Sequence, residues 1–409
     1  MTFQTSRIAS RAIADMTPDS IDSVLLAVAD ALTARGNELL EANAADCAAM
    51  DSEDPRYDRL LLTPERIADI ASGIHAVAAL PSPLGLTLDS IKRPNGLLIR
   101  KVSVPFGVIG AIFEARPNVI FDIFSLCFKA GSACVLKGGH EAARSDAKAI
   151  EIIRDALEAA GAPVDAAVLV QGGHEAADSL LKARGEIDLL IPRGSRRLID
   201  YVRDNALVPV IETGAGVCHT YFHTSGDIAT GRDIIFNAKT RRPGVCNALD
   251  CLIVDRSRLG DLPALCYHLS DKDVEIYADD EAFAALDGAY PLLHHATEAD
   301  YGREWLDYKL TVHTVECIDE ALDFISRYSS QHSECIIAES IEASERFLAS
   351  VDAACVYANV STAFTDGGQF GFGAEIGIST QKLHARGPMA LREITTYKYL
   401  ITGAGQTRS

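Results

Sequence analysis

The first eighty residues carry apolar side chains at the spacing of amphipathic helices. One such stripe comprises Ile21, Val24, Leu25, Val28 and Leu32. It follows Asp19-Ser20, two residue types that cap helix N-termini, and Thr63-Pro64 likewise places a capping residue before a proline. The region is therefore predicted to be helical up to a proline-rich break at 81–85.

Two extended segments follow this break and are joined by a turn sequence. Pro94-Asn95-Gly96 is a turn signal, so residues 88–104 are predicted to form a β-hairpin. The tail at 393–401 is rich in β-branched and aromatic residues and is predicted to be a strand. Because an isolated hairpin is marginally stable, we expect hairpin and tail to pair with each other or across a subunit boundary.

From residue 107 onward, short apolar segments alternate with helical ones. The strands predicted up to residue 214 are 107–113, 133–137, 166–170, 187–191 and 208–211. Apolar runs of the same kind follow at 251–254, 310–315, 334–338 and 354–358. Strands joined by crossover helices form parallel sheets, so the chain is predicted to be an α/β protein with two parallel-sheet domains.

Glycine-containing turns follow three of these strands. They are Lys137-Gly138-Gly139, Gln171-Gly172-Gly173 and Pro192-Arg193-Gly194-Ser195. Helix N-termini at the carboxyl edge of a parallel sheet offer amides to phosphate, which favours a nucleotide or other anionic ligand there. A GxGxxG fingerprint does not follow the early strands, and the glycine-rich stretch 371–377 has a different spacing, so we interpret it as a loop near a site.

The overall charge argues against polyanionic partners. With 38 Lys+Arg and 57 Asp+Glu, the formal net charge is −19, so neither nucleic acid nor an anionic membrane is expected to bind. Residues 90–144 oppose this trend, with eight basic and three acidic side chains. This basic segment is either a solvated face or a place where a small anionic ligand is handled.

Ten cysteines occur without a CxxC pair or regular spacing, which excludes a zinc ribbon and a disulfide scaffold. The histidines, including His294-His295, also lack metal-ligand spacing, so no metal is expected. The N-terminus shows no apolar signal-peptide core, and the apolar runs are too short to span a bilayer. A cytoplasmic location is therefore expected, with one or two chemical thiols and the others packed in the core.

Cys246 is the strongest candidate for a reactive thiol. Three cations, Lys239, Arg241 and Arg242, precede it within seven residues, and positive charge favours the nucleophilic thiolate. Pro243-Gly244 is expected to place it on a turn. The alternative is a buried cysteine beside a surface basic run, which suits Cys251 better. Two further features are Glu212, a strand-end carboxylate or helix cap, and Arg116, in a turn after a buried strand.

These features together resemble the aldehyde dehydrogenase superfamily. The Pro-x-Gly-Val-x-Gly strand at 105–110, Lys137, Gly194-Ser195, Glu212 and Cys246 occur in the superfamily's order. Within it, the chain is similar to the glutamate-5-semialdehyde dehydrogenases, or gamma-glutamyl phosphate reductases, of proline biosynthesis. The motifs that carry this likeness are Phe-Glu-Ala-Arg-Pro-Asn at 113–118, Arg-Pro-Gly-Val-Cys-Asn-Ala at 242–248, the stretch 371–378 and Leu-His-Ala-Arg-Gly-Pro at 383–388.

The resemblance implies a reaction and a catalytic set. Cys246 would attack L-glutamyl 5-phosphate to form a thioester, which hydride from NADPH reduces to L-glutamate 5-semialdehyde; the product cyclises to pyrroline-5-carboxylate. The implied catalytic residues are Cys246, Arg116, Glu212 and Asn247. Arg116 stands where other members place an oxyanion-stabilising asparagine, and Arg241 and Arg242 are expected to bind the departing phosphate. Glu212 is expected to be positional or to move a proton.

The resemblance also implies a cofactor site and a domain plan. The cofactor residues would be Lys137, Gly138, Gly194, Ser195 and Glu304. His140 stands where NAD-preferring members often carry an acid, which favours NADP(H). The expected aldehyde-dehydrogenase-like fold has an NADP-binding domain (1–86 and 106–214), a catalytic domain (215–387) and a β oligomerisation element (87–105 and 388–409).

The same resemblance implies that the protein is a homo-oligomer, either a dimer or a tetramer. It also implies that the substrate is a small molecule. Two alternatives share this fold: NAD(P)-dependent oxidation of another semialdehyde, and acyl-CoA reduction. A requirement for inorganic phosphate in the reverse reaction distinguishes the reduction of L-glutamyl 5-phosphate from both alternatives. A third alternative, a non-enzymatic scaffold with an inert cysteine, is opposed by the joint occurrence of the three motifs around Arg116, Glu212 and Cys246.

Overall fold

The computed structural model describes residues 3–54 and 56–408, which fold into two compact units. Unit 1 comprises residues up to Thr213, together with Gly371–Gly377 and Met389 onward. Unit 2 comprises Gly214–Phe370 and Ile378–Pro388. Each is described separately below.

Unit 1 begins with the predicted helical region. Its helices are α1 (Gln4–Ala14), α2 (Pro18–Cys47), α3 (Tyr57–Leu60) and α4 (Pro64–Ala79). Thr63 caps α4 as predicted, accepting a hydrogen bond from the Arg66 amide. The predicted cap of α2 at Asp19-Ser20 is wrong: Thr17 is the cap, because its side chain accepts from the Ser20 amide and Pro18 occupies the first turn. The predicted apolar stripe of α2 is buried.

A four-stranded parallel sheet forms the centre of unit 1, in the order β5-β4-β3-β6. The strands are β3 (Val108–Phe113), β4 (Ala133–Lys137), β5 (Ala167–Leu169) and β6 (Leu189–Arg193). The helices that follow them are α5 (Asn118–Lys129), α6 (Ala143–Ala159), α7 (His174–Leu181) and α8 (Arg196–Asn205). The segment 208–211, predicted to be a strand, is not one in the structure. It forms a single isolated β-bridge, between Val210 and Leu190.

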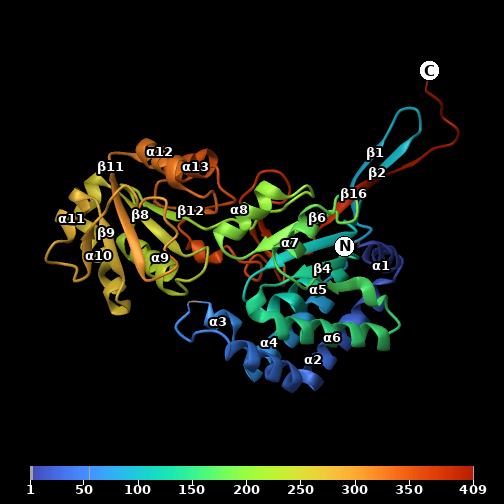
Figure 1. Ribbon diagram of the computed structural model, residues 1–409. Helices are drawn as coiled ribbons and strands as arrows, with labels where there is room; N and C mark the ends of the chain where they lie inside the picture. Colours follow the sequence, from blue (N-terminus) through green and yellow to red (C-terminus); the bar gives the residue numbers. More distant parts are fainter. Residues whose placement is uncertain (1–2, 55, 409) are drawn as a thin grey trace. The chain divides into compact units, whose positions relative to one another are not determined.

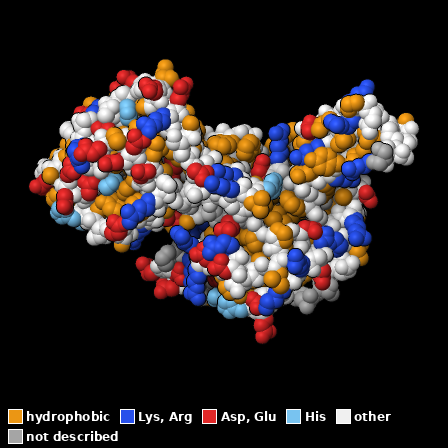
Figure 2. All heavy atoms as spheres, turned by 90° about the horizontal axis from the view of Figure 1, so that it is seen from above, with side chains coloured by type: hydrophobic (Ala, Val, Ile, Leu, Met, Phe, Trp, Pro, Cys, Tyr) orange, Lys and Arg blue, Asp and Glu red, His pale blue; other side chains and the backbone are white. Residues whose placement is uncertain are grey.

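The hairpin and tail of unit 1 form a separate antiparallel sheet, which we call the arm. It consists of β1 (Thr87–Lys92), β2 (Leu98–Pro105) and β16 (Thr395–Thr402). The expected pairing of hairpin with tail within one chain is thus confirmed. The arm projects from the rest of unit 1 and carries exposed apolar side chains beside Lys and Arg (Figures 1 and 2). They include Leu88, Ile91, Tyr397, Tyr399 and Ile401.

Unit 2 contains a seven-stranded sheet in the order β10-β9-β11-β8-β7-β12-β13, in which every pairing is parallel. Its strands are β7 (Cys218–Phe222), β8 (Leu249–Asp255), β9 (Glu275–Ala278), β10 (Leu293–His295), β11 (Lys309–Val315), β12 (Ser333–Ile337) and β13 (Cys355–Ala358). The helices are α9 (Ile228–Thr240), α10 (Leu262–Cys266), α11 (Asp280–Leu286), α12 (Ile318–Tyr328) and α13 (Ile341–Ser350). Together with unit 1, this confirms the predicted α/β class with two parallel sheets.

The remaining elements are short. The 3-10 helices span His140–Ala142, Val164–Ala166, Arg256–Asp261, Tyr267–Lys272 and Thr362–Phe364. The strands β14 (Gly377–Ser379) and β15 (Gly387–Met389) form a two-stranded sheet. No helix in residues 3–54 and 56–408 has the length and apolar character needed to cross a membrane.

The segment 371–377 lies in unit 1, whereas the sequence analysis placed it in the catalytic domain. Two of its glycines allow close packing there. A Cβ on Gly373 would lie 2.7 Å from Leu80, and one on Gly377 would lie 2.4 Å from the Arg193 guanidinium. Both residues also have positive φ angles, which glycine adopts at little cost.

Candidate active site

Cys246 lies on the turn between α9 and β8, half-buried, at the amino-terminal edge of the unit 2 sheet. Pro243 and Gly244 belong to this turn, as predicted. Arg241 follows the last residue of α9, and both Arg241 and Arg242 are exposed. The turn therefore presents a thiol and two guanidinium groups within six residues.

The carbonyl of Cys246 is held from two sides. The Cys218 thiol donates a hydrogen bond to the Cys246 carbonyl oxygen at 3.2 Å. On another side, a Cβ on Gly216 would lie only 1.6 Å from the same oxygen, so no larger residue fits there in this arrangement. Glu304 accepts a hydrogen bond from the Gly216 amide at 2.8 Å. Cys218 and Gly216 were not predicted as site residues.

Asn247, predicted as catalytic, anchors the turn. Its side-chain amide donates to the carbonyl oxygens of Thr365, at 2.9 Å, and Ala363, at 3.3 Å. Thr362 in turn donates to the Asn247 carbonyl at 2.8 Å. Because both hydrogen bonds of the Asn247 side chain go to backbone carbonyl oxygens, this geometry favours a positioning role for Asn247.

A buried polar layer underlies the turn. Lys239 and Asp250 lie 3.8 Å apart with both side chains buried. Burial lowers the pKa of Lys239 and raises the pKa of Asp250 to about 7. His219 and Glu334 form a second buried pair at 3.0 Å. The sequence signal for His219, Asp250 and Glu334 is a charged or polar side chain within an otherwise apolar strand, whereas Lys239 lies near the end of α9.

In unit 1, four of the five predicted cofactor residues lie at the carboxyl edge of the sheet, whereas the fifth, Glu304, belongs to unit 2. Lys137 ends β4, and Gly194 and Ser195 follow β6. The Lys137 ammonium is buried, donates to the Gly138 carbonyl at 2.6 Å, and has a pKa lowered by burial. A Cβ on Gly138 would lie 1.8 Å from Asp146, which explains the glycine there. Burial raises the pKa of Asp146 to about 8.

Glu114 is a residue of this edge that the sequence analysis did not assign. Its carboxylate accepts hydrogen bonds from the Ser195 amide, at 2.8 Å, and the Ser195 hydroxyl, at 3.2 Å. It thus lies at the N-terminus of α8, where an anion is favoured. The strand pairing of Phe113 with Arg193 brings Glu114 there, and its place in the Phe-Glu-Ala-Arg-Pro-Asn motif is the available signal.

Arg116 and Glu212 also belong to unit 1. Arg116 is half-buried and follows Ala115, whose φ of 40° is unusual for a residue with a side chain. The Glu212 carboxylate lies 3.6 Å from Arg203 of α8. Unit 1 therefore contains Arg116, Glu212, Lys137, Gly138, Gly194 and Ser195, and unit 2 contains Cys246, Asn247, Glu304, Arg241 and Arg242.

Comparison with known proteins identifies the family. The model of the aldehyde dehydrogenase family matches residues 2–266. The chain is 57% identical over 404 residues to the gamma-glutamyl phosphate reductase of Azobacteroides pseudotrichonymphae, covering 98% of this chain and 96% of that protein. The chain belongs to the aldehyde dehydrogenase family, in its gamma-glutamyl phosphate reductase branch.

Two further members of this branch support the assignment. The chain is 56% identical over 409 residues to the gamma-glutamyl phosphate reductase of Bacteroides thetaiotaomicron, covering 100% of this chain and 98% of that one. The crystal structure of the Thermotoga maritima gamma-glutamyl phosphate reductase is 37% identical, with a TM-score of 0.96, and covers 100% of this chain and 99% of the other. The fold and family inferred from the motifs are thereby confirmed.

The other cysteines of this family member are free thiols and, with one exception, buried. Cys317, expected to pack in the core, is exposed instead and lies at the N-cap position just before α12, where its side chain makes no capping hydrogen bond. Within residues 3–54 and 56–408, no cluster of His, Cys, Asp and Glu side chains has an arrangement that holds a metal ion.

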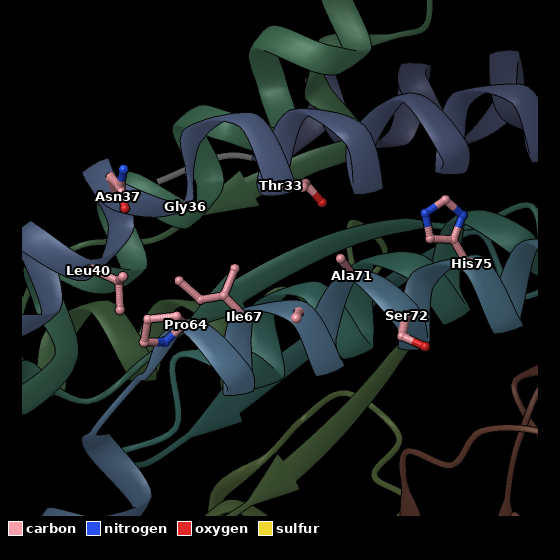
Figure 3. A pocket seen from close by; sticks show the side chains of 10 residues that line it. Thr33, Gly36, Asn37, Leu40, Pro64, Ile67, Ala71, Ser72 and His75 are labelled. Carbon is pink, nitrogen blue, oxygen red and sulfur yellow. The ribbon is translucent and has the colours of Figure 1, made fainter.

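A groove of about 430 Å³ lies between α2 and α4 of unit 1. Figure 3 shows Thr33, Gly36 and Asn37 on one helix facing Ala71 and His75 on the other. None of the sequence-predicted site residues lines it.

Proposed function

We propose that the protein reduces L-glutamyl 5-phosphate to L-glutamate 5-semialdehyde and phosphate with NADPH, in proline biosynthesis from glutamate. The observation that carries this proposal is the position of Cys246 on a half-buried turn directly after two exposed arginines. Identity of 57% to a gamma-glutamyl phosphate reductase over 98% of the chain supports the choice of substrate. The semialdehyde cyclises to pyrroline-5-carboxylate.

The chemistry follows from the Cys246 turn. The thiolate attacks the acyl carbon of the substrate, a carbon–sulfur bond forms, and the bond to the phosphate oxygen breaks to release inorganic phosphate. Arg241 and Arg242 stabilise the departing phosphate, and Arg116 is proposed to assist them, because cations are most effective where negative charge develops. The Cys246 amide serves as an oxyanion donor. A hydride supplied to the thioester carbon would give a thiohemiacetal on Cys246, whose carbon–sulfur bond breaks to release the semialdehyde and return Cys246 as the thiolate.

The residues at the carboxyl edge of unit 1 fit a nicotinamide dinucleotide phosphate. NADPH supplies the hydride when bound. Lys137 is proposed to hold the adenosine ribose, and Gly194 and Ser195 the pyrophosphate, which would replace the Glu114 carboxylate at the Ser195 amide and hydroxyl. One oxygen of Asp146 is buried without a hydrogen-bond partner in the described chain, and the raised pKa of Asp146 keeps it protonated at neutral pH. Asp146 therefore adds no negative charge beside Lys137, and His140 is exposed where an acid would disfavour a 2′-phosphate.

Three residues receive more specific roles. Glu212, which lies 3.6 Å from Arg203, is proposed to be positional and not the base that hydrolyses a thioester, because hydrolysis would waste the activated intermediate. Asn247 is proposed to fix the turn through Ala363 and Thr365. Glu304 is proposed to contact the cofactor ribose in addition to its bond with the Gly216 amide.

We further propose a cytoplasmic homo-oligomer that assembles through the arm. Exposed apolar side chains on an antiparallel sheet are an expected interface, and the arm carries Tyr399 and Ile401 at 55% and 61% exposure. The ten free cysteines are consistent with a reducing compartment.

The decisive experiment is the reverse reaction. Pyrroline-5-carboxylate and NADP are incubated with and without inorganic phosphate, and NADPH formation is followed by absorbance. We expect strict phosphate dependence, no support by coenzyme A, and at least about a thousandfold loss in Cys246→Ala. Cys317→Ala, which removes an exposed thiol of the same unit, is the matched control and should keep wild-type activity. Phosphate-independent activity, or an active Cys246→Ala variant, would overturn the proposal.

A further inference from the structure

A second cysteine lies against the backbone of the proposed nucleophile. The Cys218 side chain is fully buried, and its sulfur lies 3.2 Å from the carbonyl oxygen of Cys246. Cys218 begins β7 and pairs with Leu249 of β8, so its position is set by the sheet itself. The sulfur therefore occupies a fixed point beneath the Cys246 turn.

The surroundings keep this thiol in its protonated, donating form. Burial raises the pKa of Cys218 well above its ordinary value, and the nearby carboxyl groups of Glu334, Asp250 and Glu304 raise it further. The ring nitrogen Nδ1 of His332 lies 3.8 Å from the sulfur, and burial lowers the pKa of His332 to about 4, so that ring is neutral. Cys218 is thus a hydrogen-bond donor and not a second nucleophile.

The Cys246 carbonyl is confined on another side as well. Gly216 approaches it so closely that a Cβ would lie 2.4 Å from the carbonyl carbon, and Glu304 fixes Gly216 by accepting its amide hydrogen. A carbonyl held in this way fixes the peptide plane between Cys246 and Asn247. That plane holds the Cα of Cys246 in place and so limits the directions open to its side chain.

We propose that Cys218 is a positioning residue for the reaction: its thiol donates to the Cys246 carbonyl and so holds the nucleophile in its attacking orientation. This inference rests on the proposed nucleophilic role of Cys246. A misplacement of about 1 Å costs on the order of a hundredfold in rate, so a weak S–H bond at this point has a large kinetic effect.

The test compares Cys218→Ser, which keeps a hydroxyl donor, with Cys218→Ala, which has none. Cys266→Ala is the matched control, because Cys266 is also fully buried in unit 2 and lies in α10. Reverse-direction kinetics should show kcat reduced about 10- to 100-fold in Cys218→Ala with KM within about twofold, and near-normal kcat in Cys218→Ser and Cys266→Ala. Equal losses in the Ser and Ala variants, or a fully active Cys218→Ala, would overturn the positioning role.

A second readout separates this inference from the proposed function. Alkylation of Cys246 by iodoacetamide is followed by mass spectrometry of its peptide, without substrate or cofactor. The rate should change at least about threefold in Cys218→Ala and stay at the wild-type value in Cys218→Ser and Cys266→Ala. An unchanged rate in Cys218→Ala would count against the inference. If Cys246→Ala keeps activity, the proposed function fails, whereas the alkylation rates still test the contact between the two cysteines.

Discussion

Lys239 and Asp250 form an ion pair at 3.8 Å in which both side chains are buried beneath the Cys246 turn. Asp250 also accepts a hydrogen bond from the Trp305 amide at 3.0 Å, which ties the segment after Glu304 to the sheet. A buried pair of this kind contributes little net stability while intact, but the loss of one partner leaves an uncompensated charge.

Removal of the cation should therefore destabilise unit 2. Lys239→Met is expected to lower the free energy of unfolding by about 3–5 kcal/mol at pH 9, where the Asp250 carboxyl of the wild type is ionised, measured by urea titration. The double variant Lys239→Met with Asp250→Asn should recover part of this loss, because asparagine is neutral and keeps an oxygen for the Trp305 amide. A single variant as stable as the wild type, or a double variant less stable than the single one, would contradict this account.

Asp146 should make unit 1 less stable as the pH rises. Its pKa is raised from 3.8 to about 8 by burial, so between these values the folded state holds a proton that the unfolded state has lost. This stabilising contribution is complete below about pH 4 and disappears as the pH rises through about 8. Asp146→Asn, which cannot ionise, should match the wild type at acidic pH and unfold at a higher temperature at pH 9.

The measurement is thermal unfolding of both proteins at several pH values. Asp69→Asn serves as the control, because Asp69 is exposed on α4 and its substitution should change stability by less than about 0.5 kcal/mol at any pH. A difference between Asp146→Asn and the wild type that does not grow with pH would refute the assignment.

Gly216→Ala should impair catalysis by moving the Cys246 turn. The added Cβ would lie 1.6 Å from the Cys246 carbonyl oxygen, so the backbone must shift by more than an ångström. We expect kcat to fall by about a hundredfold or more. Gly260→Ala is the control, since a Cβ there meets nothing within 4 Å and activity should stay within about twofold. Equal activity of the two variants would show that the turn tolerates displacement.

The arm should carry the subunit interface. Replacing both Tyr399 and Ile401 by serine removes two large exposed apolar side chains from β16 and is expected to produce monomers, detected by analytical ultracentrifugation. Ile341→Ser on α13 is the control, because Ile341 is 75% exposed but lies in unit 2. An unchanged sedimentation coefficient in the arm variant would place the interface elsewhere or leave the wild type a monomer.

Local sequence determined much of this protein. The alternation of apolar strands and amphipathic helices reflects periodicities that short segments carry by themselves, and the Pro94-Asn95-Gly96 turn needs only its own residues. The cluster of Arg241, Arg242 and Cys246 is likewise a property of one continuous turn. The sequence also predicted that Lys137 and Ser195 lie at the same edge of the unit 1 sheet, because the carboxyl ends of parallel strands lie at one edge.

Other features depended on contacts between distant segments. The strand β7 was missed because its polar His219 interrupts the apolar pattern, and only pairing with Glu334, 115 residues away, makes that burial tolerable. The hydrogen bond of Glu304 to the Gly216 amide and that of Cys218 to Cys246 are invisible in the sequence for the same reason. Tertiary packing alone decides which buried polar groups meet, because each must find its partner once water is excluded.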